Sequence, residues 1–371
     1  MTLRLLSALV LGAAALAGAQ DVAVQGGLVL AGRGQEPLTG GGVVVRDGKV
    51  VTLSHEFPDG LRVDRYPGAV ITPGFVDLRT HLGGLGDLTE AAEAFALDVD
   101  ALDAVDPKSR EFAQALRAGI TSCAVVPGDA AVFAGRGGLL KTAGGARLEG
   151  AALAKLSLTA DVLRDDRAPT SAVMAYSELR ARLEAGHQDG EDAFAAFARG
   201  SIPGLCTVDD AGHARRMLEL EQALGLRLIL HLDPRPEPEF GRLKLAGQPV
   251  VLGPYDLDAD PLTLALPQQL AAQRAELCFT SAAPLRDPRA QRVSALLAVG
   301  AGLDPDVALD ALTGAPARAL GLGDRIGTLA AGADGDLAVW SAHPLEAGAR
   351  LLAVYVDGRR VYRRPASGGA Q

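Results

Sequence analysis

The stretch IPGLCTVDDAGHARRMLELEQALGLRLILHL, residues 202–232, carries the pattern that decides the fold. It begins with an apolar run typical of a buried strand, after which Asp209 and Asp210 offer side chains that can cap a helix. Apolar residues at helical spacing follow, and Gly225 ends that pattern just before a second apolar run. A strand, a helix and another strand in this order predict a βαβ unit with parallel strands.

The same alternation runs through the middle of the chain. Apolar runs occur seven times between stretches rich in Ala, Leu and Arg, as VITPGFVDL, ITSCAVVP, LAKLSL, IPGLCTV, LRLILHL, PVVLGP and AELCFTS. A (β/α)8 barrel typically takes about 250 residues. We therefore predict an α/β fold in which residues 71–326 form a TIM-like (β/α)8 barrel, with the eighth strand between Lys155 and Ala175. The alternative is a doubly wound open sheet, which would place a site at a switch point of the strand order.

Both ends of the chain show the pattern of β-hairpins. Asp-Gly pairs stand between β-branched runs in VVVRDGKVV, around Asp47, and in VYVDGRRVY, around Asp357. Asp-Gly favours a tight hairpin turn, and short hairpins are marginally stable alone. We therefore predict that residues 20–70 and 327–371 form one composite β-sandwich, into which the barrel is inserted.

Residues 1–19 have the layout of a secretory signal. A positive charge at Arg4 precedes a short apolar stretch and then small residues before Gln20. The alternative is a membrane anchor, but the apolar stretch is shorter than the roughly 20 residues that span a bilayer. We expect a cleaved signal peptide and a secreted or periplasmic protein without an integral membrane segment.

The charge of the chain and its cysteines exclude several classes of function. The formal net charge is −9, whereas nucleic acids and anionic membranes bind basic surfaces, so we expect no nucleic-acid partner. Cys123, Cys206 and Cys278 each lie in an apolar run and are odd in number. We interpret them as small buried side chains and not as a disulfide framework or nucleophiles.

Three segments resemble the amidohydrolase family, especially its exported branch related to imidazolonepropionases. They are ITPGFVDLRTHLG at 71–83, AGITSCAVVPGDAAVFAGRGGLLKT at 118–142, and a tail at 320–361 with LGLGDRIGTLAAGADGDLAVWSAHPL and VDGRRVY. The first is similar to the family's first barrel strand, Pro-Gly-Phe-Ile-Asp-x-His-x-His, and the second to its second strand and glycine-rich loop. The resemblance implies a barrel with a composite β-sandwich. It also implies hydrolysis of amide, lactam or related C–N bonds by a metal-bound water.

The histidines that this family uses to hold a metal are mostly replaced. Arg79 stands at the first histidine of the His-x-His pair, and His81 matches the second. Thr207 stands where the family usually has a histidine after a Pro-Val-x-Val run. His231 falls where some members carry a histidine at a strand end.

Two further positions complete the comparison with the family. Ala282 occupies the place of the aspartate in the family's Gly-Ser-Asp motif, which removes both a ligand and the general base that the resemblance implies. Lys155 aligns loosely with a lysine found in relatives.

These replacements bear on the metal. His81 and His231 remain as vestigial ligands where about four are needed. The permanent charge of Arg79 would also repel a cation bound at His81. We therefore expect no cofactor, and a divalent metal such as zinc only if the site is rebuilt. His231 followed by Asp233, Glu237 and Glu239 is the candidate for rebuilding, against the interpretation that these carboxylates form a solvated loop.

Arg79 is expected to have a new role. Asp77, Arg79 and His81 alternate along one strand, so their side chains point to the same side, toward the barrel interior. A buried guanidinium must be paired. Our hypothesis is that Arg79 occupies the vacated metal position and bonds to Asp77, to another pocket carboxylate, or to the carboxylate of a ligand. The alternative is an arginine that extends into solvent past Gly83.

Two functions follow for the whole chain. The resemblance implies a hydrolase that acts on non-peptide C–N bonds, and the replaced ligands predict that its activity is weak or lost. The alternative is a non-catalytic periplasmic protein that binds a small-molecule ligand in the barrel mouth or serves as a scaffold. Fold alone does not choose between them, and nothing in the sequence specifies an oligomeric state.

Overall fold

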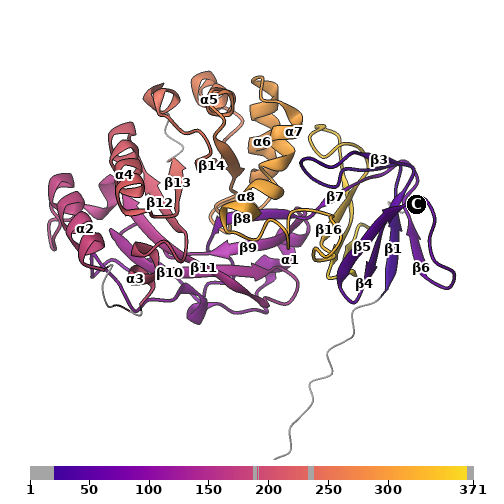
Figure 1. Cartoon of the computed structure of the whole chain (residues 1–371), viewed down its shortest axis with the longest axis horizontal. Coiled ribbons are helices and arrows are strands. Elements are labelled where there is room, and N and C mark those ends of the chain that lie inside the picture. Colours follow the sequence, from indigo (N-terminus) through magenta and orange to yellow (C-terminus); the bar gives the residue numbers. More distant parts are fainter. Residues whose placement is uncertain (1–20, 187–189, 191, 233–237, 366–371) are drawn as a thin grey trace, which may run out of the picture.

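The computed structural model describes residues 21–186, 190, 192–232 and 238–365 of the chain. The expected signal peptide lies outside these residues. Figure 1 shows a sheet with flanking helices at one end of the molecule and a smaller β-structure at the other. In that smaller part, the indigo strands of the N-terminal segment lie beside the yellow strands of the C-terminal segment.

The larger part is built on an eight-stranded sheet in the order β15-β14-β13-β12-β11-β10-β9-β8. All neighbouring strands are parallel except around β10, which runs antiparallel to both of its neighbours. The strands are β8 (Phe75–Thr80), β9 (Ile120–Val125), β10 (Phe133–Lys141), β11 (Arg147–Leu158), β12 (Gly204–Val208), β13 (Leu228–Leu232), β14 (Pro249–Leu252) and β15 (Glu276–Phe279).

The two end strands of this sheet meet and nearly close it into a barrel. Thr280 Oγ1, just after β15, lies 2.8 Å from the carbonyl oxygen of Arg79 in β8. The backbone N–H of His81 donates to the carbonyl of Ala283 at 2.8 Å. The predicted TIM-like barrel is therefore confirmed, and the open doubly wound sheet is not formed.

Helices follow most of the strands. The 3-10 helices are η1 (Ala101–Ala104), η2 (Ala160–Val162) and η3 (Pro238–Arg242), and the α-helices are α1 (Arg110–Leu116), α2 (Ala172–Gly186), α3 (Ala193–Ala198), α4 (Ala211–Leu224), α5 (Pro261–Ala272), α6 (Ala290–Gly300), α7 (Pro305–Asp310) and α8 (Gly314–Ala319). In α4 the Asp210 side chain accepts the backbone N–H of His213, and Gly225 ends the helix in the left-handed conformation, as the sequence predicts. Among the described helices, none is long and apolar enough to cross a bilayer.

The position of the eighth barrel strand corrects the prediction. It is β10, within the segment that the sequence suggested as a glycine-rich loop. The stretch from Lys155 to Ala175 instead holds the end of β11, the short helix η2 and the start of α2. A Cβ on Gly137 would lie 2.0 Å from the carbonyl oxygen of Val125 in β9, so glycine there lets the two strands approach.

The two ends of the chain share a sheet. Its order is β18-β17-β16-β7-β2-β3, with β18 (Arg359–Arg363), β17 (Leu351–Val356), β16 (Leu337–Trp340), β7 (Val70–Pro73), β2 (Leu28–Val29) and β3 (Leu38–Thr39). The N-terminal β7 and the C-terminal β16 pair antiparallel from Leu337 opposite Pro73 to Trp340 opposite Val70. A second sheet has the order β5-β4-β1-β6, with β5 (Lys49–Ser54), β4 (Gly42–Arg46), β1 (Val22–Gln25) and β6 (Arg62–Arg65).

Both predicted hairpins are formed. Asp47 and Gly48 connect β4 to β5, and Asp357 and Gly358 connect β17 to β18. All four residues have positive φ, between 48° and 78°, which is the conformation that a two-residue Asp-Gly turn requires. A buried cluster that includes Val24, Val45, Ile71, Val339 and Tyr355 fills the space between the two sheets. The composite β-sandwich is therefore present.

Candidate functional site at the barrel mouth

A cavity of about 270 Å³ lies at the carboxyl ends of the barrel strands, where barrel enzymes place their sites. The strands present alternate residues to it. Leu205 of β12 and Ile229 of β13 belong to one buried cluster, and Thr207 and His231 follow two residues later on the same faces. The lining side chains discussed below are Arg79, Asp129, Thr159, Thr207, His231 and Ala282.

Two cations meet one carboxylate beside this cavity. The Arg79 guanidinium donates to Asp129 Oδ2 at 2.5 Å. The ammonium of Lys155 bonds to the other oxygen, Oδ1. The Asp129 side chain is 16% exposed, that of Arg79 15%, and that of Lys155 is wholly buried. We refer to Arg79, Asp129 and Lys155 as the mouth triad.

The hydrogen bonds of Lys155 indicate that its side chain is a charged ammonium group. Nζ lies 2.7 Å from the carbonyl oxygen of Leu156 and 2.9 Å from Ser157 Oγ, in addition to Asp129. Ser157 Oγ uses its own hydrogen to bond Asp129 at 2.8 Å, so it accepts from Lys155. Thr207 Oγ1, at 3.1 Å, is a fourth oxygen partner of Nζ. An ammonium offers three hydrogens to these oxygens, whereas a neutral amine offers only two.

The electrostatics of Asp129 agree with an ion-paired triad. Burial by itself would raise the pKa of this carboxyl, but the charges of Lys155 and Arg79 outweigh burial and hold the pKa well below its usual value. Complete burial lowers the pKa of Lys155 even though Asp129 opposes that shift. With four oxygen atoms around Nζ, we take the pair as Asp⁻ and Lys⁺ at neutral pH.

Thr207 joins the mouth triad to His231. Thr207 Oγ1 lies 3.1 Å from Lys155 Nζ and 3.2 Å from His231 Nδ1. Burial, and then the charge of Arg79, hold the pKa of His231 well below its usual value, so the ring is neutral. When the Thr207 hydroxyl donates to Nδ1, the ring hydrogen sits on Nε2. That atom is buried and has no hydrogen-bond partner within the described residues.

His81 is brought to the same end of the barrel but is not bound into this network. Burial, with Arg79 second, lowers the pKa of His81 to about 4, so it is neutral at pH 7. Its backbone closes the barrel against Ala283, and its side chain is partly exposed.

Asp77 does not pair with the Arg79 guanidinium. The carboxylate is wholly buried and accepts from the Thr280 hydroxyl at 2.7 Å and from Ser281 N–H and Oγ at 2.9 and 2.5 Å. Its bond with Arg79 runs only through the backbone N–H, at 3.2 Å. Of the partners expected for Arg79, the one formed is another pocket carboxylate, Asp129.

Asp129 was not singled out in the sequence. It lies in the loop between β9 and β10, in the segment VVPGDAA, which has no periodic pattern. The available signal was its place just beyond the carboxyl end of a barrel strand, where site residues gather. Ala282, the other sequence candidate, lines the cavity with φ of 54° and offers no donor or ligand atom in its side chain.

The residues at the barrel mouth do not fit a divalent metal. Arg79 and Lys155 place two positive charges beside the carboxylate of Asp129, which uses both of its oxygens on them. Within the described residues, the group of three potential ligands that lie within 4.8 Å of one another is Asp209, Asp210 and His213, at the start of α4. Of the acidic loop, Asp233 and Glu237 lie outside the described residues.

Comparisons with known proteins agree with the motifs. A family model described as "Amidohydrolase family" matches residues 279–362. A curated relative, "Amidohydrolase tasK" of Hapsidospora irregularis, is 24% identical over 400 aligned residues, which cover 88% of this chain. The chain spans only 40% of the length of that relative.

Solved structures share the fold. The crystal structure of an amidohydrolase from Thermotoga maritima MSB8 matches 92% of this chain and 100% of its own, with a TM-score of 0.81 and 24% identity. A Xaa-Pro dipeptidase with bound methionine matches 93% of this chain and 100% of its own, with a TM-score of 0.55 and 12% identity. Residues 279–362 therefore resemble the amidohydrolase family, the whole chain is similar to a curated amidohydrolase, and the solved structures show that the chain shares their fold.

Proposed function

We propose that the barrel mouth binds a small anionic molecule and that the chain has lost hydrolysis by a metal-bound water. The mouth triad supports the loss, because two side-chain cations stand where the family's motif residues would gather metal ligands. The activity of the ancestral kind, on non-peptide C–N bonds, is then weak or absent.

One observation carries the binding proposal. Three buried side-chain atoms have no hydrogen-bond partner within the described part of the chain and belong to residues that line this cavity: Arg79 Nε, Thr159 Oγ1 and His231 Nε2. Leaving a buried polar group unpaired costs about 1–3 kcal/mol. An accepting group placed in the cavity would satisfy them.

The chemistry of the donors specifies the ligand. Arg79 Nε, the His231 Nε2 hydrogen and the Thr159 hydroxyl all donate to acceptors. The mouth triad has two positive charges and one negative, so its net charge favours an anion. A cavity of about 270 Å³ is slightly below the usual range for drug-sized ligands. These features fit a small carboxylate better than a peptide.

The test measures binding and turnover on the same protein. We expect small carboxylates such as propionate or N-acetylglycine to raise the unfolding temperature of the mature protein, while N-acetylglycine is not hydrolysed. Replacing His231 by Phe removes the Nε2 donor and should abolish the shift. The matched control, His343→Phe, lies outside this cavity and should keep it.

Two outcomes would contradict the proposal. One is a stabilisation by carboxylates that His231→Phe leaves unchanged. The other is hydrolysis of an amide by the purified protein that is lost on addition of a chelator.

A further inference from the structure

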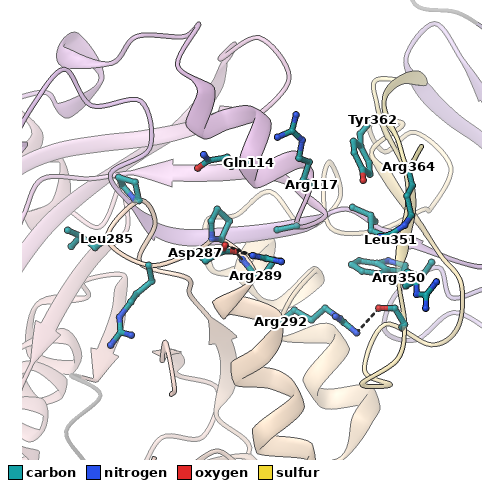
Figure 2. Close-up of a pocket in the computed structure, with 16 residues that line it drawn as sticks. Gln114, Arg117, Leu285, Asp287, Arg289, Arg292, Arg350, Leu351, Tyr362 and Arg364 are labelled. Atoms are coloured by element: carbon teal, nitrogen blue, oxygen red, sulfur yellow. Dashed lines mark hydrogen bonds and ion pairs between the residues drawn. The ribbon is translucent and has the colours of Figure 1, made fainter. Parts of the chain in front are cut away.

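A second cavity, of about 790 Å³, lies outside the barrel, where the barrel meets the sandwich (Figure 2). Its walls come from α1, from the loop before α6, and from β17 and β18 of the sandwich. We call it the arginine cavity after its lining arginines: Arg117, Arg286, Arg289, Arg292, Arg350 and Arg364. Asp287 is the one carboxylate in the lining. Such an excess of positive charge is notable in a chain whose formal net charge is −9.

Most of these charges have no counter-ion. Arg286 pairs with Asp256, and Arg289 with Asp287, each at 2.7 Å. The side chains of Arg117, Arg350 and Arg364 form no hydrogen bond or ion pair within the described residues. Figure 2 shows Arg117, Arg289 and Arg364 spread around the cavity and not gathered on one wall.

Arg292 is fixed in place without being neutralised. Its Nε donates to the carbonyl of Pro344 at 2.5 Å, and its Nη2 donates to the carbonyls of Glu346 and Ala349 at 2.8 and 3.4 Å. Its guanidinium lies over the ring of Trp340, 5.3 Å from the centroid. Burial lowers the pKa of Arg292, and within the described part of the chain no carboxylate forms an ion pair with it. A bound anion would stabilise a partly buried, immobilised cation of this kind.

The amino end of α6 adds to the positive potential of the arginine cavity. Arg289 is the N-cap residue of this helix and forms no capping hydrogen bond with its side chain, and Arg292 lies in the first turn. The amino end of a helix carries partial positive charge, so cations there are unfavourable and anions favourable. Two arginines at this end depart from the charge preference of a helix, and departures of this kind are expected at functional sites.

We propose that the arginine cavity binds an organic anion with two or more carboxylate or phosphate groups. Guanidinium groups recognise both groups through paired, charge-assisted hydrogen bonds. Several unpaired arginines around one cavity favour a multivalent anion over a single charge. The volume of about 790 Å³ suits a small organic molecule, and this ligand is distinct from the one proposed for the barrel mouth.

Calorimetric titration of the mature protein at low ionic strength tests the proposal. The probes are citrate for carboxylates, pyrophosphate for phosphates, and acetate as a single-charge reference. We expect citrate or pyrophosphate to bind at least about ten-fold more tightly than acetate, with the stronger of the two identifying the anionic group.

A charge-matched pair of variants locates the site. Arg117→Gln with Arg364→Gln removes two charges from the cavity. Arg110→Gln with Arg363→Gln removes two from α1 and β18 outside it. We expect Arg117→Gln with Arg364→Gln to weaken binding of the tighter-binding probe at least about ten-fold. Arg110→Gln with Arg363→Gln should weaken it less than about two-fold. Equal losses in both pairs, or no preference for multivalent anions in the parent protein, would overturn the proposal.

Discussion

At the scale of single residues, an ion-pair network occupies the barrel mouth. Asp129 lies between Arg79 and Lys155, and Thr207 is hydrogen-bonded to both Lys155 and His231. Buried charges are tolerated only when paired and hydrogen-bonded, and this network meets both conditions. The positive charges that deter a metal are therefore also what stabilises the carboxylate.

The neutral histidines make the stability of the fold depend on pH. The folded pKa of His81 is about 4, below its ordinary value of 6.5. Between these two values the unfolded chain binds the proton and the folded chain does not, so stability falls as pH decreases from about 6.5 to about 4. We expect His81→Gln to remove on the order of 1–3 kcal/mol of this loss.

Denaturant unfolding at pH 7.5 and pH 4.5, in buffer with a chelator, measures the effect. The matched control is His55→Gln, at an exposed turn after β5, which should keep the pH dependence of the parent. If His81→Gln and the parent lose the same stability between the two pH values, His81 is not held neutral by the fold.

Part of this site was predictable from the sequence. The alternation in strand 71–83 pointed Arg79 toward the barrel interior, and the resemblance matched Thr207, His231 and, loosely, Lys155 to family positions. The structure brings Arg79, Thr207 and His231 to one cavity, and Lys155 Nζ bonds to Thr207 Oγ1. The sequence did not predict Asp129 as a site residue, because Asp129 lies in a loop and its partner Arg79 is 50 residues away in sequence. Local sequence patterns do not predict such a long-range contact.

At the scale of elements, the sequence located seven of the eight barrel strands and misplaced one. The missing strand, β10, is rich in glycine, which lowers strand propensity and imitates a loop. It forms because it is paired on both sides, with β9 and β11, and because glycine lets those neighbours approach. Tertiary pairing here overrides the local preference.

This account of β10 can be tested at Gly137. A methyl group there would lie 2.0 Å from the Val125 carbonyl oxygen, so backbone must shift, and we expect Gly137→Ala to cost at least about 2 kcal/mol. Gly300→Ala, at the end of α6 where nothing lies within 4 Å, should be neutral or stabilising by up to about 1 kcal/mol. Equal unfolding free energies for the two variants would refute the close approach of β9 and β10.

At the scale of the whole molecule, a buried lysine joins the C-terminal segment to the barrel. Lys141, at the end of β10, pairs with Asp334, Asp336 and Asp357 of the C-terminal segment at 2.7, 2.6 and 3.0 Å. Burial alone would lower the pKa of Lys141, but the three carboxylates raise it. The Asp-Gly hairpins predicted the composite sandwich, whereas this junction depends on residues that are far apart in sequence.

The arginine cavity lies at the same junction between barrel and sandwich. Sequence patterns did not reveal it, because its arginines come from the end of α1, from the loop before α6 and its first turn, and from the residues that flank β17 and β18. In the sequence, nothing distinguishes these arginines from ordinary surface residues, and only the fold brings them together.

The metal content of the purified protein tests the central claim most directly. After incubation with zinc or manganese and dialysis, elemental analysis should find well under one equivalent per chain, and a chelator should leave the stability unchanged. The triple variant Arg79→His, Thr207→His and Ala282→Asp, which restores the family's ligands, should gain bound metal. One tightly held equivalent in the parent protein, with stability that falls on its removal, would contradict the account.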